Sequence, residues 1–279
     1  QGTVSSGISY GDVNQDGYLD IYVSTFGYSS LEDEKRNRLY INNGDLTFTE
    51  SAKAYGVDNG GYTVQSAFFD YDNDNDLDLF VMNQPSNVRL GKTTFVHQDL
   101  ISKETSDLLF RNDGNKFTDV SSSAGIESAA YGLGLCISDI NQDGYQDIYI
   151  ANDYEKPDCM YLNNGNGTFT NTIDKAVNHM SNFSMGMDIA DINNDTWLDI
   201  YIANDYYVPD AMYISNKDGT FTNTIKEATK QVSFYGMGVD IGDVNNDNLE
   251  DIFVLDMASQ DHVRSKTLMA SMNVPKFNL

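Results

Sequence analysis

A short acidic segment recurs five times along the chain, with Asp or Asn at positions 1, 3 and 5 and Asp at position 9. The copies read GDVNQDGYLDIYV at 11–23, FDYDNDNDLDLFV at 69–81, SDINQDGYQDIYI at 138–150, ADINNDTWLDIYI at 190–202 and GDVNNDNLEDIFV at 242–254. Calcium is a hard cation that takes six to eight oxygen ligands. A loop with oxygen-bearing side chains at alternate positions suits one such ion, so the pattern predicts five calcium sites.

We number these segments loops 1 to 5, counting position 1 from the first Asp of each. Positions 1, 3, 5 and 9 are predicted to supply side-chain oxygens, and position 7 a backbone carbonyl. The predicted ligands are Asp12, Asn14, Asp16, Tyr18 and Asp20 in loop 1; Asp70, Asp72, Asp74, Asp76 and Asp78 in loop 2; Asp139, Asn141, Asp143, Tyr145 and Asp147 in loop 3; Asp191, Asn193, Asp195, Trp197 and Asp199 in loop 4; and Asp243, Asn245, Asp247, Leu249 and Asp251 in loop 5.

Position 6 is predicted to make a sharp turn with positive φ. Glycine occupies it in two loops and Asn in two others, and both residue types tolerate that conformation. Thr196 occupies it in loop 4. A β-branched residue is disfavoured at positive φ, so we expect a strained backbone there.

An EF-hand, a different metal and a metal-free turn each fit the loops less well. An EF-hand needs Glu at position 12 and flanking helices, whereas these loops have Val or Ile there and strand-like neighbours. Mg²⁺ resists sites made entirely of protein ligands, and Zn²⁺ prefers clustered Cys or His. A single copy is compatible with a metal-free acidic turn, but five copies in one register favour a shared ligand.

The loops sit inside a larger repeat of four strand-like segments, A to D. Segment A precedes each loop and is rich in Gly, and segment B follows it with apolar and aromatic residues. Segments C and D are joined by NNG, NDG or KDG steps, which are strong hairpin turns. A four-stranded antiparallel unit that repeats about every 50 residues predicts an all-β fold, a β-propeller whose calcium loops join strands A and B.

The predicted blades begin near residues 3, 62, 131, 183 and 235, and residues 1–279 form a single propeller region. The fifth unit has segments A and B but no hairpin after them. We therefore expect part of a longer propeller; the alternative is a ring in which the two chain ends share a blade. The chain opens on Gln1 rather than Met, as expected of a mature or trimmed product.

Composition narrows the functional classes. The chain has 17 Lys and Arg against 42 Asp and Glu, a formal charge of −25 that five Ca²⁺ ions would change to −15. This balance argues against nucleic acids and anionic membranes as partners. No run of 18 apolar residues exists, so no transmembrane helix is expected. Cys136 and Cys159 fall in strands expected to flank a third, which favours two buried free thiols over a disulfide.

The loops and hairpins resemble the FG-GAP or VCBS-type repeat of integrin α-chain propellers and bacterial surface proteins. Within that group, the chain is most similar to bacterial secreted proteins related to cartilage acidic protein, the ASPIC/UnbV group. The segments that carry this similarity are NRLYINNGDLTFTE, GYTVQSAFFDYDND and VLDMASQDHVRSKTLM. The resemblance implies a seven-bladed ring with calcium on one rim. It also implies a secreted or cell-surface location and a role in binding or adhesion.

In such a blade the B–C connections lie on the rim opposite the metal loops. Here they span 24–37, 83–106, 152–158 and 204–210, and we predict that they form the surface for a protein or glycan partner. Their aromatic residues either face that partner or pack on neighbouring blades: Tyr28, Tyr154, Tyr206 and Tyr207. The long 83–106 connection also carries Arg89, Lys92 and Lys103.

No catalytic pattern stands out. His97, His179 and His262 are scattered, and G-x-S-x-G, Walker A and H-E-x-x-H motifs are missing from the sequence. We therefore expect a binding or scaffolding module rather than an enzyme, with no catalytic residues. The alternatives are a polysaccharide-active lyase or hydrolase, since carboxylates are abundant, and a purely structural part of a larger surface assembly.

Overall fold

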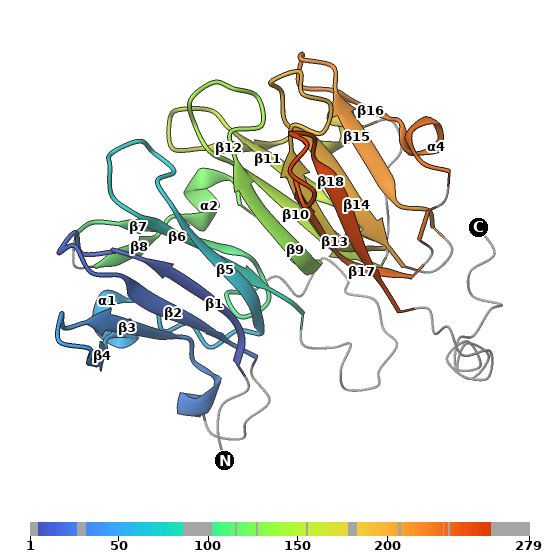
Figure 1. The fold of residues 1–279 in the computed structure, drawn as a ribbon. Coiled ribbons are helices and arrows are strands. Elements are labelled where there is room, and N and C mark those ends of the chain that lie inside the picture. The colour runs from blue at the N-terminus through green and yellow to red at the C-terminus, as the bar shows by residue number, and fades with distance from the viewer. Residues whose placement is uncertain are drawn as a thin grey trace, which may run out of the picture.

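The computed structural model describes residues 5–26, 32–85, 102–114, 116–126, 128–154, 156–177, 183–205, 208–230, 232–233 and 235–257. Over these residues the chain forms antiparallel sheets that stand side by side like blades (Figure 1). The predicted all-β fold of four-stranded antiparallel propeller blades is confirmed.

The first two sheets follow chain order. Sheet 1 contains β1 (Ser5–Gly11), β2 (Asp20–Thr25), β3 (Arg38–Asn42) and β4 (Phe48–Glu50). Sheet 2 contains β5 (Thr63–Phe69), β6 (Asp78–Asn83), β7 (Leu108–Asn112) and β8 (Phe117–Asp119).

The next two sheets repeat this meander, and the last described one has two strands. Sheet 3 contains β9 (Tyr131–Ser138), β10 (Asp147–Asp153), β11 (Cys159–Asn163) and β12 (Phe169–Asn171). Sheet 4 contains β13 (Ser184–Ala190), β14 (Asp199–Asn204), β15 (Ala211–Ser215) and β16 (Phe221–Asn223). Sheet 5 pairs β17 (Gly236–Gly242) with β18 (Asp251–Asp256).

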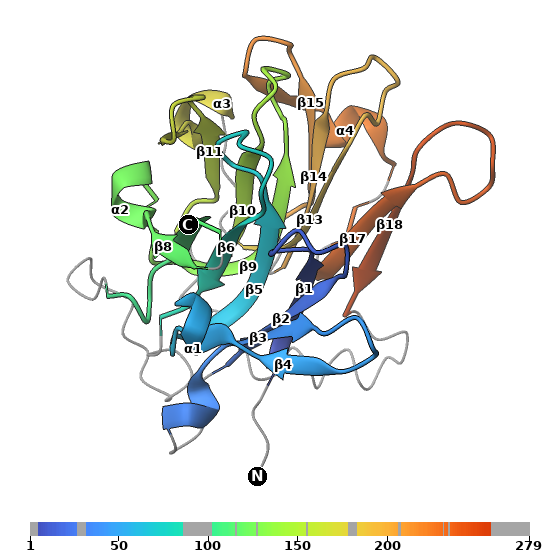
Figure 2. The ribbon, with the colours of Figure 1, turned by 90° about the vertical axis from the view of Figure 1, so that its left-hand side faces the viewer.

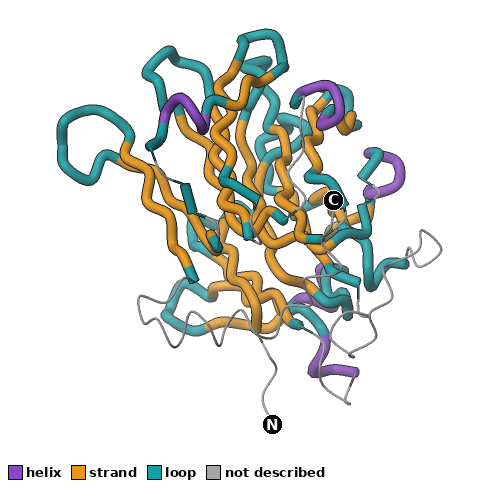
Figure 3. Tube along the Cα trace, turned by 90° about the vertical axis from the view of Figure 1, so that its right-hand side faces the viewer, coloured by secondary structure: helices purple, strands orange, loops and turns teal. Residues whose placement is uncertain are grey.

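Short helices were not predicted. One turn of α-helix follows the fourth strand of each four-stranded sheet: α1 (Ala52–Tyr55), α2 (Ser121–Ala124), α3 (Ile173–Ala176) and α4 (Ile225–Ala228). A 3₁₀ turn, η1 (Glu32–Lys35), precedes β3. The helices lie at the outer side of the array (Figures 2 and 3). Four residues are too few to show helical periodicity, so the sequence pattern carried no signal for them.

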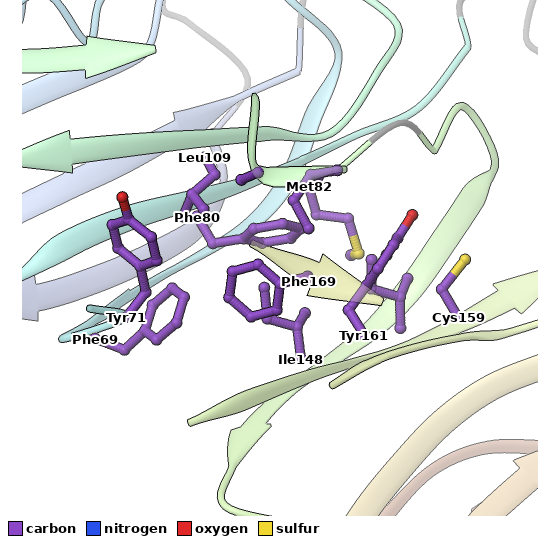
Figure 4. Close-up of a cluster of buried hydrophobic side chains, with 12 residues drawn as sticks. Phe69, Tyr71, Phe80, Met82, Leu109, Ile148, Cys159, Tyr161 and Phe169 are labelled. Atoms are coloured by element: carbon purple, nitrogen blue, oxygen red, sulfur yellow. The ribbon is translucent and has the colours of Figure 1, made fainter. Parts of the chain in front are cut away.

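The core lies between successive sheets, and strand alternation explains how one sheet serves two neighbours. On β6, Leu79 and Val81 join the cluster shared with sheet 1, while Phe80 and Met82 join the cluster shared with sheet 3. Figure 4 shows the second cluster, in which Ile148 meets the sheet 2 side chains. Because successive side chains point to opposite faces, the middle of this strand is apolar on both faces.

Glycines in the first strands of sheets 1, 3, 4 and 5 let these strands approach the neighbouring sheet closely, whereas β5 has no glycine. A Cβ on Gly186 of β13 would lie 2.6 Å from the Cα of Gly238 in β17. A Cβ on Gly132 of β9 would lie 2.5 Å from the sulfur of Met82. The Gly-rich character of segment A is therefore a packing requirement.

A buried polar residue ties the second strand of each four-stranded sheet to the third. Asp107, Asp158 and Asp210 each accept the backbone N–H of an Asn at the end of the second strand, at 2.8–3.0 Å. Asn37 does the same for Thr25 in sheet 1, at 2.7 Å. Burial raises the pKa of Asp107 to about 8 and that of Asp158 to about 7. These residues were not predicted, although Asp directly precedes the third strand in three of four units.

The two cysteines are free, as favoured from the sequence. Cys136 lies on β9 and Cys159 on β11, and β10 runs between them. Cys159 is buried and Cys136 half-buried. Among the described helices, none has the length and apolar character needed to cross a bilayer.

The sheets at the two ends of the array expose apolar side chains whose equivalents in the inner sheets are buried. Ile8 and Tyr10 of β1 are 69% and 71% exposed, and Phe253 and Leu255 of β18 are 63% and 58% exposed. The equivalent of Phe253 in sheet 3, Tyr149, is 1% exposed. Further blades would cover such faces, and the continuation of the array into a longer ring stays a prediction.

Candidate metal centres

The five acidic loops share one backbone conformation, with positive φ at positions 4 and 6. At position 6, Gly17 and Gly144 have φ of 89° and 90°, and Thr196 has φ of 75°. The expected strain at Thr196 is therefore present. Position 4 holds Gln or Asn with φ near 60° in every loop, which was not predicted: Gln15, Asn73, Gln142, Asn194 and Asn246.

The position 1 aspartates form the loops through backbone hydrogen bonds. Asp12 accepts the N–H of Asp16 at 3.0 Å and the N–H of Gly17 at 2.8 Å, one on each carboxylate oxygen. Asp70, Asp139, Asp191 and Asp243 accept the same two N–H groups in their loops. In each loop the position 5 aspartate then accepts the N–H of position 7.

The position 9 aspartates stand at the start of the second strand, where those of loops 1 to 4 are buried and Asp251 is half-buried. In Asp20, Asp78, Asp147 and Asp199, one oxygen accepts the N–H of loop position 2 and the other accepts an N–H at the end of the third strand. Asp251 accepts the loop N–H of Val244 and, on the same oxygen, the side-chain N–H of Asn245. No third-strand N–H is added, because sheet 5 has no third strand among the described residues. Burial raises the pKa of Asp78 to about 8 and that of Asp147 to about 6.

Loop 2 has the donor set that best fits a cation. Asp70, Asp72 and Asp78 each bring a carboxylate oxygen within 4.8 Å of the others. One oxygen of Asp72 and one of Asp76 are buried without a hydrogen-bond partner. Burial and the neighbouring carboxylates raise the pKa of Asp76 to about 6. Buried carboxylate oxygens that lack donors are costly unless a cation neutralises them, so these residues fit a hard divalent ion.

Asp76 was expected to contribute only its carbonyl. Its pKa responds to Asp70, Asp72 and Asp74, which places its carboxylate within their electrostatic reach. Loop 2 therefore has five neighbouring carboxylates where loop 1 has three. The sequence showed this Asp, but position 7 holds uncharged residues in the other loops, so its side chain was overlooked.

Aromatic residues at position 7 pack against the hairpin of their own sheet. The ring of Tyr18 lies 2.8 Å from the place of a Cβ on Gly44, and the ring of Tyr145 lies 2.8 Å from that of Gly165. These glycines have positive φ in the turn between the third and fourth strands. The contact holds in place the residue whose carbonyl is the predicted ligand.

Loop 4 differs because it already contains a protein cation. Lys217 stands where Gly44 and Gly165 stand in other sheets, and its φ is 65°. Its Nζ lies 3.2 Å from a carboxylate oxygen of Asp195, the predicted position 5 ligand. The hydrogen bond of Trp197 and the charge of Lys217 lower the pKa of Asp195. An ion at loop 4 would compete with this ammonium group for Asp195.

On the opposite rim, Tyr154 is the described member of the predicted aromatic set. It has φ of 66°, and its ring meets that of Tyr131 edge to face at 5.2 Å between centroids. Tyr131 belongs to the same sheet, so packing of Tyr154 on a neighbouring blade stays a prediction. Lys103 pairs with Asp119 of β8. Several predicted or weighed residues lie outside the described residues: Tyr28, Tyr206, Tyr207, Arg89, Lys92, His97, His179 and His262.

Comparison with known proteins agrees with this architecture. A sequence profile of the FG-GAP-like repeat matches residues 12–81, 139–202 and 191–254, which together cover more than half of the chain. Each match begins at the first Asp of one loop and ends in the second strand of the next sheet. The chain therefore belongs to the FG-GAP-like repeat family. A search of curated proteins finds no match.

Two solved structures are similar in fold. The V. cholerae biofilm matrix protein Bap1 aligns with a TM-score of 0.50 and 13% identity, over 90% of this chain and 35% of its own. This chain thus spans about a third of that protein. An Agrocybe aegerita lectin, described as recognising non-reducing terminal N-acetylglucosamine, gives a TM-score of 0.49 and 15% identity, over 95% of this chain and 69% of its own. At such identities the Bap1 likeness supports the fold alone.

Proposed function

We propose that this chain is a calcium-binding, extracellular β-propeller module that binds a protein or glycan partner. The observation that carries the calcium part is loop 2, where buried oxygens of Asp72 and Asp76 have no hydrogen-bond donor. Calcium suits these oxygens because it accepts irregular sets of carboxylate and carbonyl ligands. The same loop backbone recurs in the other four copies, which extends the proposal to up to five ions.

The hydrogen bonds within each loop fix its backbone before any ion binds. The position 1 and position 9 carboxylates already hold the backbone through N–H donors, as Asp12 and Asp78 show. A bound divalent ion neutralises the mutual repulsion of these carboxylates. Calcium therefore serves stability in this proposal, and most of the negative charge belongs to the scaffold.

The partner surface is assigned to the rim opposite the metal loops. Its support is the sequence of the B–C connections, with Tyr154 held in positive φ beside Tyr131. Next to them, Asp153 is buried, and burial raises its pKa to about 6. Tyr154 is half-buried, and the exposed part of its ring suits a sugar or a polar protein surface. A binding rather than catalytic role, and the extracellular location, are part of the proposal.

Two experiments test the proposal. Calorimetric titration of the metal-free chain with calcium should show binding, and Asp72→Ala should weaken one site while leaving the others. Absence of heat and an unchanged melting midpoint in EDTA would contradict the calcium part. Glycan-array binding that is lost in Tyr154→Ala, without product formation, would support the partner surface. Turnover of a polysaccharide, abolished by changing a residue outside the five loops, would show that the chain is an enzyme instead.

A further inference from the structure

The position 4 side chains connect each acidic loop to the loop of the next sheet. Gln15 of loop 1 donates from Nε2 to the carbonyl of Asn75 in loop 2, at 2.9 Å. Asn73 of loop 2 donates from Nδ2 to the carbonyl of Gly144 in loop 3, at 3.0 Å. Gln142 of loop 3 donates in the same way to the carbonyl of Thr196 in loop 4. Three successive loops therefore repeat one contact, from position 4 to the next position 6.

The acceptor lies at the centre of the neighbouring loop. The position 6 N–H is held by the position 1 aspartate, and the following N–H, of position 7, is held by the position 5 aspartate. The position 6 carbonyl and the position 7 N–H belong to the same peptide group. A hydrogen bond to that carbonyl thus orients the peptide next to the predicted carbonyl ligand. The donor residue itself lies between the predicted ligands at positions 3 and 5.

A second set of contacts runs in the opposite direction across two of the interfaces. Asn112 of β7 donates to the carbonyl of Val13 in loop 1 at 2.9 Å, and Asn163 of β11 donates to that of Tyr71 in loop 2 at 2.7 Å. Ser215 occupies this place in β15, so among the described residues Gln142 makes the one side-chain hydrogen bond between loops 3 and 4. Asn194 of loop 4 makes no such side-chain bond to loop 5 within the described residues.

We infer that the position 4 side chains couple neighbouring metal loops, so that an ion in one loop favours an ion in the next. This inference rests on the proposed calcium function. An ion that orders positions 3 and 5 of one loop also restricts position 4 between them, and the ordered donor then pre-forms the next loop. The coupling is reciprocal, as linkage requires. It extends along loops 1 to 4 and is lost between loops 4 and 5.

Trp197 makes the coupling measurable at one site. It is the only tryptophan of the chain and occupies position 7 of loop 4. The metal-free chain is titrated with Tb³⁺, which takes the same oxygen ligands, and luminescence is excited through tryptophan. This signal reports the occupancy of loop 4. Asp143→Ala removes a ligand of loop 3, and the ratio of loop 4 affinities with and without this change measures the coupling.

The expected ratio is about two- to tenfold, the effect of one net hydrogen bond. It should fall to one in Gln142→Ala, and persist in Gln142→Asn, because Asn73 makes the same contact with the shorter side chain. Asn194→Ala is the matched control and should keep the wild-type ratio. Urea midpoints of the metal-free variants show whether each still folds.

The outcomes distinguish failure of the coupling from failure of the calcium sites. A ratio of one in the wild-type chain, or a ratio that survives Gln142→Ala, overturns the coupling while leaving calcium binding intact. Absence of both the Tb³⁺ signal and calorimetric calcium binding overturns the proposed function and the coupling with it.

Discussion

Thr196 provides a direct test of backbone strain in the acidic loops. It has φ of 75°, whereas the same position holds Gly17 and Gly144 in loops 1 and 3 and Asn75 and Asn248 in loops 2 and 5. A non-glycine residue in the left-handed region costs roughly 1–2 kcal/mol, and a β-branched one more than Asn. The Thr196 side chain is exposed and makes no hydrogen bond to the described residues, so its removal loses little.

Thr196→Asn should therefore stabilise the metal-free chain by about 1 kcal/mol, which corresponds to about 2–4 °C in melting temperature for a chain of this size class. The reciprocal change is Gly144→Thr. A Cβ at Gly144 meets nothing within 4 Å, so its cost is conformational and free of steric clash. The net effect of Gly144→Thr should be a destabilisation of about 1 kcal/mol. This figure already includes a stabilising contribution of about 0.4–1 kcal/mol, because Thr makes the unfolded chain less flexible than Gly does.

The assay is urea unfolding in EDTA and again in saturating calcium, followed by Trp197 fluorescence and by circular dichroism. The midpoint should shift while the slope stays constant, since neither change alters the buried surface. A neutral or destabilising Thr196→Asn together with a neutral Gly144→Thr would refute the argument that position 6 stores strain. Opposite shifts of similar size would support it.

Three further results are expected. The metal-free chain should lose stability as pH rises from about 4 to about 8, because Asp107 and Asp158 ionise in the unfolded chain near their ordinary pKa but stay protonated when folded up to about 8 and about 7. Asp158→Asn should flatten that dependence in a melting series, and an unchanged slope would contradict it. Lys217→Met should tighten Tb³⁺ binding at loop 4, since it removes the ammonium 3.2 Å from Asp195; equal or weaker binding would show that Lys217 does not compete. Calcium at 100 times its Kd should stabilise by about 2.7 kcal/mol per independent site, so EDTA should lower the melting temperature by several degrees, and Asp72→Ala should reduce that difference.

Much of the fold could be predicted because its signals are local and repeated. The apolar run in LDLFV at 77–81, the NNG turns and the spacing of the acidic loops all specify single elements. Strand order followed because antiparallel neighbours joined by short turns pair with each other. The single propeller region over 1–279 and the seven-bladed ring stay predictions.

The candidate sites could be predicted in position but not in detail. The spacing identified every loop. It did not show that the carboxylate of Asp76 interacts with its neighbours in loop 2, or that the ammonium of Lys217 pairs with Asp195, because the other repeats have different residues at these two positions. The contact from Gln142 to Thr196 joins residues 54 positions apart on different sheets. Such contacts depend on how two sheets are set side by side, which a single sequence pattern does not encode.

The buried polar residues at the start of the third strands have a consequence for how the opposite rim can vary. The same hydrogen bond, from the end of the second strand to Asn37, Asp107, Asp158 or Asp210, closes connections that span 12, 24, 6 and 6 residues. Each of these four connections is closed at its base by this hydrogen bond. A change in the length of a connection should therefore leave the strands of the sheet in place. We therefore expect these connections to be exchangeable, and a foreign loop grafted between Asn152 and Asp158 should leave the blade intact.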